Sequence, residues 1–222
     1  MLKEKLSNYL KNYNTYFSSR IEDNERIFKN LNKLLKFNNK LEISSGSRLL
    51  DLGSGDKSFY KVCLNNGINA IELDGSSQGI DFEKDKLPYE NNHFDYIYFC
   101  AVLEHLHDAN FILTEIYRVL KNGGILIIIT PNFRYCYKEF YNDPTHFHPY
   151  TPKSLKKILE MNNFIDNCVN PFLINKSVNY WKIPCKFFVA SILPFRNDSF
   201  QNFPIPSFLR GKSTSMISIS QK

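Results

Sequence analysis

The run Leu49–Gly55 constrains the fold more than any other stretch of the chain. The apolar residues Leu49 and Leu50 lead to Asp51, and Gly53 and Gly55 follow with one residue between them. An apolar stretch that ends at closely spaced glycines is typical of a buried parallel strand that turns sharply into a helix. Glycines let the backbone turn tightly and approach a bound nucleotide. The run predicts a strand, a loop and a helix, with either a nucleotide site or a plain turn at the glycines.

A second strand-like run, residues 68–73, ends at Asp74, about 20 residues further on, where an acid accepts hydrogen bonds from a ribose. Two features argue against a dinucleotide at this site. Ser58 stands where the G-x-G-x-x-G motif has its third glycine, and the carboxylate of Asp51 would repel a pyrophosphate. A ligand with a ribose and a cationic amino-acid end would tolerate that acid. S-adenosylmethionine, which carries no phosphate, fits these requirements.

Strands and helices alternate from Ser47 onward, and this alternation predicts a doubly wound α/β fold with a mostly parallel sheet. Ligands in such sheets bind at the carboxyl ends of the strands. The sequence therefore places Asp51, Asp74, Asp81 and Cys100, each at the end of a predicted strand, in one cleft. Strands are predicted at 47–52, 68–73, 79–82, 94–100, 124–130, 164–169 and 213–220, and helices at 57–66, 109–121 and 152–162.

From the glycine loop onward the chain resembles the class I S-adenosylmethionine-dependent methyltransferases, in their small-molecule, type 11-like branch. The resemblance covers roughly residues 47 to 165. After the glycine loop it is carried, in the family's order, by Leu87-Pro88-Tyr89, Phe94-Asp95-Tyr96-Ile97-Tyr98, Leu103-Glu104-His105-Leu106, Arg118-Val119-Leu120-Lys121-Asn122-Gly123-Gly124 and Thr130-Pro131-Asn132. It implies a seven-stranded Rossmann-like sheet whose last strand is antiparallel.

The resemblance also implies which residues hold the cofactor. The loop residues Asp51, Gly53, Ser54 and Gly55 would hold the methionine tail of S-adenosylmethionine. The ribose hydroxyls would bind at Asp74 and Gly75, and the adenine at Asp81 and Phe82. Cys100 and Ala101, after the fourth strand, would lie beside the tail.

A hydroxyl or ammonium acceptor must lose a proton when it is methylated, and this calls for a general base. We expect the base to be His146, with Asp143 as its orienting partner, because both lie in a loop after the fifth strand that also holds Thr145 and His148. A structural role for this loop and a metal site are the alternatives. Only three local ligands are available, so no metal is expected. His105 is another candidate for proton transfer, and helix capping is an equal alternative for it.

Three segments make up the predicted chain. Residues 1–45 are expected to be helical and to dock on the cofactor-binding core, residues 46–170. Residues 171–222 hold an insert rich in proline and phenylalanine and then the closing strand of the same domain. The insert is expected to cover the acceptor side of the cleft, with a membrane surface as the less favoured alternative. Its large apolar residues include Trp181, Phe187, Phe188 and Phe195.

The composition narrows the class of protein. The net charge of +6 comes from scattered lysines, so a nucleic-acid partner is not implied. The five cysteines form no C-x-x-C pair, no signal peptide opens the chain and no apolar run of about 18 residues occurs, so we expect a cytoplasmic protein with reduced thiols. The predicted function is methyl transfer to an oxygen or nitrogen of a small-molecule or glycan- or lipid-linked acceptor. A nicotinamide-dependent oxidoreductase and a non-catalytic cofactor-binding module are the alternatives, and the oligomeric state cannot be predicted.

Overall fold

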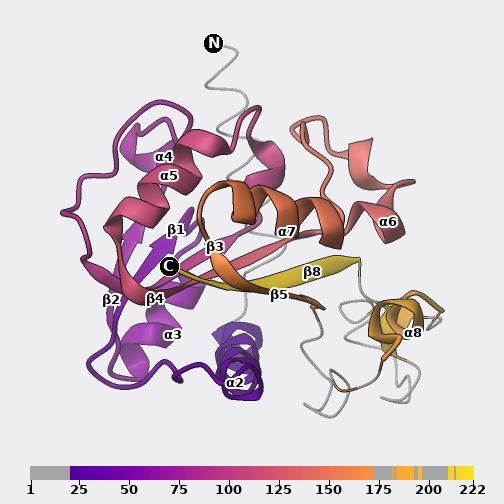
Figure 1. Ribbon diagram of the computed structural model, residues 1–222, viewed down its shortest axis with the longest axis horizontal. Helices are drawn as coiled ribbons and strands as arrows, with labels where there is room; N and C mark the ends of the chain where they lie inside the picture. The colour runs from indigo at the N-terminus through magenta and orange to yellow at the C-terminus, as the bar shows by residue number, and fades with distance from the viewer. Residues whose placement is uncertain (1–20, 173–181, 183, 193–194, 197–209, 213) are drawn as a thin grey trace.

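The computed structural model describes residues 21–172, 182, 184–192, 195–196, 210–212 and 214–222. In the described part, a central sheet lies between two layers of helices (Figure 1). The sheet has the strand order β2-β1-β3-β4-β8-β5. Its strands are β1 (Arg48–Leu52), β2 (Asn69–Leu73), β3 (Phe94–Cys100), β4 (Leu120–Pro131), β5 (Ile165–Pro171) and β8 (Ser215–Gln221).

The sheet is mostly parallel, as predicted. β1 pairs in parallel with β2 and β3, and β3 with β4. The last strand, β8, is inserted between β4 and β5 and is antiparallel to both, so the antiparallel closing strand is confirmed.

The predicted strand at 79–82 is wrong, and the described sheet has six strands instead of seven. Gly79 has φ +73° and ends a short helix, α4 (Gly75–Gln78). A hydrogen-bonded turn follows, in which the N–H of Asp81 donates to Oδ2 of Asp85 and the N–H of Asp85 donates to the carbonyl of Asp81. These local bonds satisfy backbone groups that a strand would have offered to the sheet.

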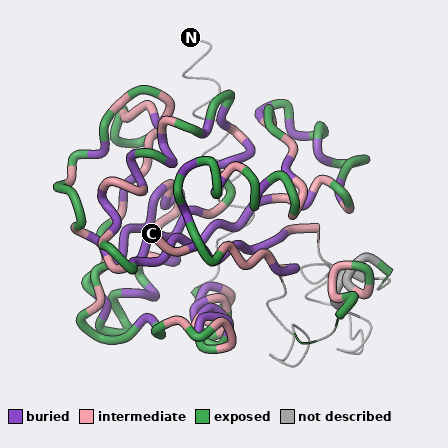
Figure 2. The backbone as a smooth tube through the Cα atoms, viewed as in Figure 1, coloured by how far each residue is buried: buried purple, intermediate pink, exposed green. Residues whose placement is uncertain are grey.

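Helices cover both faces of the sheet (Figure 1). On one face, α2 (Ile21–Phe37) and α3 (Ser58–Asn65) pack on strand residues such as Leu49 and Ile127. On the other face, α5 (Asn110–Val119) and α7 (Pro152–Met161) bury residues such as Ile112 and Leu155 against β3 and β4. The buried residues follow the strands and the inner sides of these helices (Figure 2). Each face of the sheet is thus covered by a hydrophobic core. A binding site is expected at the carboxyl ends of the strands.

Shorter elements complete the described chain. They are η1 (Leu103–His105), α6 (Phe133–Cys136), η2 (Phe140–Asn142), α8 (Lys186–Ile192), β6 (Phe195–Arg196) and β7 (Arg210–Lys212), of which β6 and β7 form a separate parallel pair. None of the described helices is long and apolar enough to cross a membrane.

The predicted N-terminal helix and the aromatic insert are only partly described. Residues 1–20 of the predicted helical segment lie outside the described residues, as do Trp181 and the side chain of Phe195. Of the remaining insert residues, Phe187 packs against the core and Phe188 is exposed. The proposed acceptor-facing role of the insert stays a prediction.

Candidate active site

The glycine loop leaves β1 at the carboxyl edge of the sheet. Gly53 has φ +77° and Gly55 has φ +50°, in the region that favours glycine. The N–H of Gly53 donates to the carbonyl of Leu73, at the end of β2, over 2.7 Å. A Cβ at Gly53 would lie only 2.3 Å from Cγ2 of Val102, which follows β3. The loop is therefore a tight connection that contacts the ends of both neighbouring strands.

Asp51 lies beneath this loop in β1, and its side chain is buried. Among the described residues, its Oδ2 has no hydrogen-bond partner. Burial raises the pKa of the Asp51 carboxyl to about 8, and the nearby negative charges of Glu72, Asp56 and Asp74 add to the rise. A buried acceptor atom in acidic surroundings is suited to a cationic ligand group.

Ser54 and Glu72 make a contact that was not predicted from the sequence. The Ser54 hydroxyl donates to Oε2 of Glu72 over 3.0 Å, and Nζ of Lys57 lies 2.6 Å from Oε1 of the same carboxylate. Glu72 therefore holds the loop to β2, and the hydroxyl of Ser54 is engaged in this contact. The only signal in the sequence was a polar residue within a strand-like run.

Asp74 ends β2 and joins two loops. Its Oδ2 accepts a hydrogen bond from the N–H of Gly55 over 3.2 Å, and its Oδ1 accepts one from the N–H of Ser77 over 2.9 Å, which caps α4. Each carboxylate oxygen has a second lone pair, so Asp74 can still accept bonds from a ligand. A Cβ at Gly75 would lie 2.6 Å from the carbonyl oxygen of Ile80 and close to the ring of Phe82.

Asp81 and Phe82 follow in the loop after α4, so the expectation that Asp81 ends a strand is wrong. Asp81 accepts a hydrogen bond from the N–H of Glu83 and lies 2.9 Å from Nζ of Lys84, so its side chain stabilises the turn. The Phe82 ring is buried, with its centroid 6.5 Å from that of Phe99 in an edge-to-face contact.

Cys100 and Ala101 lie where β3 ends, next to β1 in the sheet. Loss of solvation raises the pKa of the Cys100 thiol to about 12, so the thiol stays protonated at neutral pH. Ala101 is exposed and has φ +52°, an uncommon backbone conformation for an alanine. The N–H of Ala101 donates to the carbonyl of Ile129 and so ties this turn to β4.

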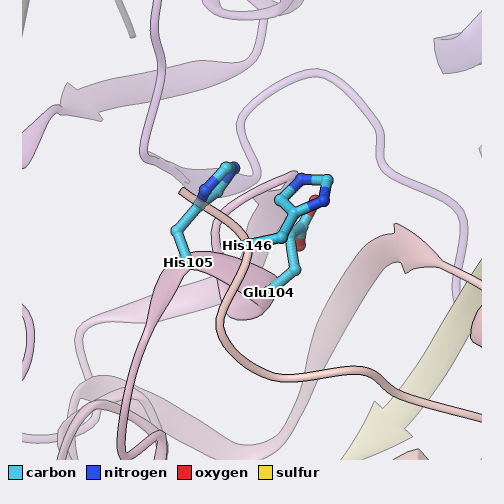
Figure 3. Close-up of side chains that lie close together, drawn as sticks. All are labelled: Glu104, His105 and His146. Atoms are coloured by element: carbon cyan, nitrogen blue, oxygen red, sulfur yellow. The ribbon is translucent and has the colours of Figure 1, made fainter. Parts of the chain in front are cut away.

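A second group of polar side chains lies where β3 and β4 end. Glu104 and His105 belong to η1, after β3, whereas Asp143 and His146 lie in the loops after β4. Figure 3 shows that His146 reaches Glu104 and His105 from a separate segment. One potential ligand atom from each of these three residues lies within 4.8 Å of the other two. Because β3 and β4 are neighbouring parallel strands, their carboxyl ends bring the two segments together.

Backbone contacts fix the protonated nitrogen of both histidines. Nδ1 of His146 lies 2.7 Å from the carbonyl oxygen of Phe140, which can only accept a hydrogen bond. Nδ1 of His105 lies 3.0 Å from the carbonyl oxygen of Thr145 and 2.9 Å from its hydroxyl, and that hydroxyl donates to Oδ1 of Asp143 over 2.6 Å. Nδ1 is therefore the donor in both rings, and each neutral imidazole offers a lone pair at Nε2.

Two carboxylates accompany these histidines. Glu104 is buried and accepts a hydrogen bond from the hydroxyl of Thr130 over 3.0 Å, and burial raises the pKa of Glu104 to about 7. Asp143 is also buried, and its Oδ2 lies 3.9 Å from Nε2 of His146, beyond hydrogen-bonding distance. Burial also lowers the pKa of His105, which favours its neutral form.

The residue pattern predicted only part of this cluster. It selected Asp143 and His146, and these residues do lie together. It left Glu104 out, although the Glu104-His105 pair after a strand was a visible signal. His148 is exposed, and its ring centroid lies 5.3 Å from that of Tyr150. A shallow cavity of about 240 Å³ beside His148 and Tyr150 is lined by none of the cluster or glycine-loop residues.

Comparisons with known proteins identify the family. Residues 19–167 match a family described as a methyltransferase domain. An uncharacterized protein of Methanocaldococcus jannaschii is 33% identical over 181 residues, 71% of this chain and 77% of that protein. A ubiquinone/menaquinone biosynthesis C-methyltransferase of Desulfotalea psychrophila is 38% identical over 74 residues, 30% of each chain.

Solved structures share the fold. A SAM-dependent methyltransferase from Archaeoglobus fulgidus has a TM-score of 0.58 at 19% identity and covers 90% of this chain and 94% of its own. The chain belongs to the methyltransferase domain family and is a class I methyltransferase that uses S-adenosylmethionine.

Proposed function

We propose that this enzyme methylates an oxygen or nitrogen of a small-molecule or glycan- or lipid-linked acceptor, and that the acceptor binds beside Glu104, His105, Asp143 and His146. The observation that carries this proposal is the position of that cluster. It follows β3 and β4, and Val102, two residues before Glu104, packs against the glycine loop. Groups that can take up a proton thus lie next to the proposed cofactor site.

The residues at the carboxyl edge fit S-adenosylmethionine. The unpartnered Oδ2 of Asp51 suits the ammonium group of its amino-acid end, and Asp74 has lone pairs left for ribose hydroxyls. Gly53, Ser54 and Gly55 form the loop that would lie beside that end. Gly75, Asp81 and Phe82 follow Asp74 in the chain, and Cys100 and Ala101 lie where β3 ends. When bound, the cofactor supplies a methyl group on a positively charged sulfur, which is already activated for transfer.

The protein must then position the acceptor and accept its proton. We assign proton removal to His146 and Asp143. Nδ1 of His146 donates its proton to the carbonyl of Phe140. Nε2 is therefore the nitrogen that can take a proton from an acceptor or contact a group bound to the acceptor. Asp143 is held in place by Thr145, whose N–H and hydroxyl both donate to Oδ1. This arrangement fixes the position of both side chains.

An acceptor screen tests the proposed function. The purified chain would be incubated with methyl-labelled S-adenosylmethionine and with hydroxylated, amino, glycan and quinol acceptors, and the labelled product would be identified by mass spectrometry. We expect an O- or N-methylated product. His146→Ala should lower turnover by about 10²–10⁴-fold, the usual contribution of a group that assists proton transfer.

The control is His93→Ala, because His93 precedes β3 at the opposite end of that strand. Its turnover should equal that of the wild type. Affinity for S-adenosylhomocysteine should be unchanged in both variants. Near-normal turnover of His146→Ala would contradict the assignment of the cluster to the acceptor.

Carbon methylation of a quinol ring is a second candidate. It is favoured by the similarity to the Desulfotalea psychrophila C-methyltransferase, although the match spans less than a third of each chain. The quinol arm of the screen separates the two candidates, since a C-methylated quinol as the only product would replace the proposed function.

A further inference from the structure

We propose that Glu104, His105 and His146, together with Asp143, bind one divalent transition-metal ion. The side chains come from two loops and point into one space (Figure 3). Glu104, His105 and His146 each place one potential ligand atom within 4.8 Å of the other two, and Oδ2 of Asp143 lies 3.9 Å from Nε2 of His146.

The histidines are oriented as metal-binding histidines usually are. A histidine that ligates a metal commonly donates its other ring N–H to a carbonyl or carboxylate, which fixes the tautomer and the direction of the ring. Nδ1 of His105 is held by Thr145, and Nδ1 of His146 by the carbonyl of Phe140. Both Nε2 lone pairs are therefore available for an ion.

An unsatisfied atom of the cluster also supports a metal site. Asp143 is only 4% exposed, and its Oδ2 has no hydrogen-bond partner among the described residues. Its distance of 3.9 Å to Nε2 of His146 is too long for a hydrogen bond. Two ligands of a tetrahedral ion at about 2.0–2.2 Å lie roughly 3.3–3.6 Å apart, so a movement of a few tenths of an ångström would bring both atoms to one ion. A cation between the two atoms would satisfy both lone pairs.

Charge balance supports the same conclusion. Glu104 is 1% exposed, and two buried carboxylates close together are costly without a positive charge. Within the described part of the chain, neither Glu104 nor Asp143 pairs with a lysine or arginine. A divalent ion would balance the two negative charges, and imidazole with carboxylate ligands suits Mn²⁺, Fe²⁺, Co²⁺ or Zn²⁺ better than Ca²⁺ or Mg²⁺.

The role of the ion, but not its binding, rests on the proposed function. An ion bound here could take the acceptor oxygen as a further ligand and polarise it, which makes its proton easier to lose. His146 and Asp143 would then assist proton removal by holding the ion. From the sequence no metal was expected, because the ligands of the 143–148 loop lie close together in the chain and those of η1 do not.

Metal binding can be measured without an acceptor. The tag-free, full-length protein would be treated with chelator, dialysed and titrated calorimetrically with Mn²⁺, Co²⁺ and Zn²⁺, with Mg²⁺ for contrast. We expect one equivalent of a transition metal to bind more tightly than Mg²⁺. Glu104→Gln and His146→Ala should weaken this binding by about 100-fold or more, since even outer-shell changes cost 10–100-fold. His93→Ala should bind as the wild type does.

The outcomes separate this inference from the proposed function. No bound equivalent in the wild type, or equal binding in the Glu104→Gln and His146→Ala variants, would overturn the metal site. Circular dichroism and thermal melting show whether each variant is folded, and Asp143→Asn replaces any variant that is not. Methyl transfer that persists in chelator and is lost in His146→Ala would keep the proposed function and reject the ion's role. Metal binding without any methylated acceptor would keep the metal site and reject the proposed function.

Discussion

Gly53 and Val102 are in such close contact that a Cβ at Gly53 would lie 2.3 Å from Cγ2 of Val102. The loop after β1 and the residue that leads into η1 therefore share one packed contact. Because Glu104 and His105 lie two and three residues after Val102, the same contact holds the glycine loop close to the polar cluster. Gly53 is the point where the glycine loop meets the segment that leads to the polar cluster.

The first prediction uses a pair of glycines. Gly53→Ala places an alanine at φ +77° and against Val102. Gly79→Ala places one at a similar φ, +73°, but no atom lies within 4 Å of its Cβ. The left-handed backbone alone should cost about 1–2 kcal/mol in each variant. Overpacking against Val102 should cost Gly53→Ala about 1–3 kcal/mol more. Urea unfolding measures both, and equal stabilities would contradict the close contact. Val102→Ala should rescue part of the loss in Gly53→Ala.

The second prediction concerns stability and pH. Burial raises the pKa of Asp51 from 3.8 to about 8, so between these values the folded protein holds a proton that the unfolded chain has lost. The free energy of unfolding should therefore fall as the pH rises through this window, by up to about 1.4 kcal/mol per pH unit from this group. Asp51→Asn removes this contribution. Urea unfolding between pH 5 and 8 should show that the free energy of unfolding depends less on pH in the variant than in the wild type. An equal pH dependence in both proteins would contradict the raised pKa of Asp51.

The third prediction concerns the affinity for the cofactor product. An ammonium group beside Asp51 favours the charged carboxylate, so binding of S-adenosylhomocysteine should lower the pKa of Asp51 and release a proton. Affinity should rise several-fold between pH 6 and 8 in the wild type relative to Asp51→Asn, in which residue 51 cannot titrate. Calorimetry in buffers of different ionisation enthalpy measures the released proton directly. Equal proton release by both proteins would place the ammonium group elsewhere.

The fourth prediction separates the two roles of Asp74. Asp74→Ala should weaken binding of S-adenosylhomocysteine by about tenfold or more, because bonds to a charged acceptor are lost. It should also cost about 1 kcal/mol of stability through loss of the cap on Ser77. Asp74→Asn is the matched control, since an asparagine oxygen can still cap the helix. We expect it to keep that stability but to bind weakly, and tight binding by Asp74→Asn would show that the charge is not used.

Local sequence patterns determined most of the strands and the main helices. The apolar run before Gly53 predicted β1, and the acid at Asp74 marked the end of β2. The prediction failed at 79–82, where Gly79 adopts a left-handed conformation and Asp81 and Asp85 close a turn. A short apolar run cannot distinguish a strand from such a turn, because both satisfy their backbone groups and only the neighbouring chain decides between them.

Tertiary structure alone decided the composition of the polar cluster. Glu104 and His146 are 42 residues apart in the chain, and they meet because β3 and β4 are neighbours and parallel. The direction of each imidazole depends on the carbonyls of Phe140 and Thr145, which no residue pattern encodes. The sequence by itself determined the α/β class, the glycine loop and the acids beneath it, since these follow from local periodicity and backbone freedom. Contacts between distant loops depend on the packing of the whole sheet, and only the folded chain shows them.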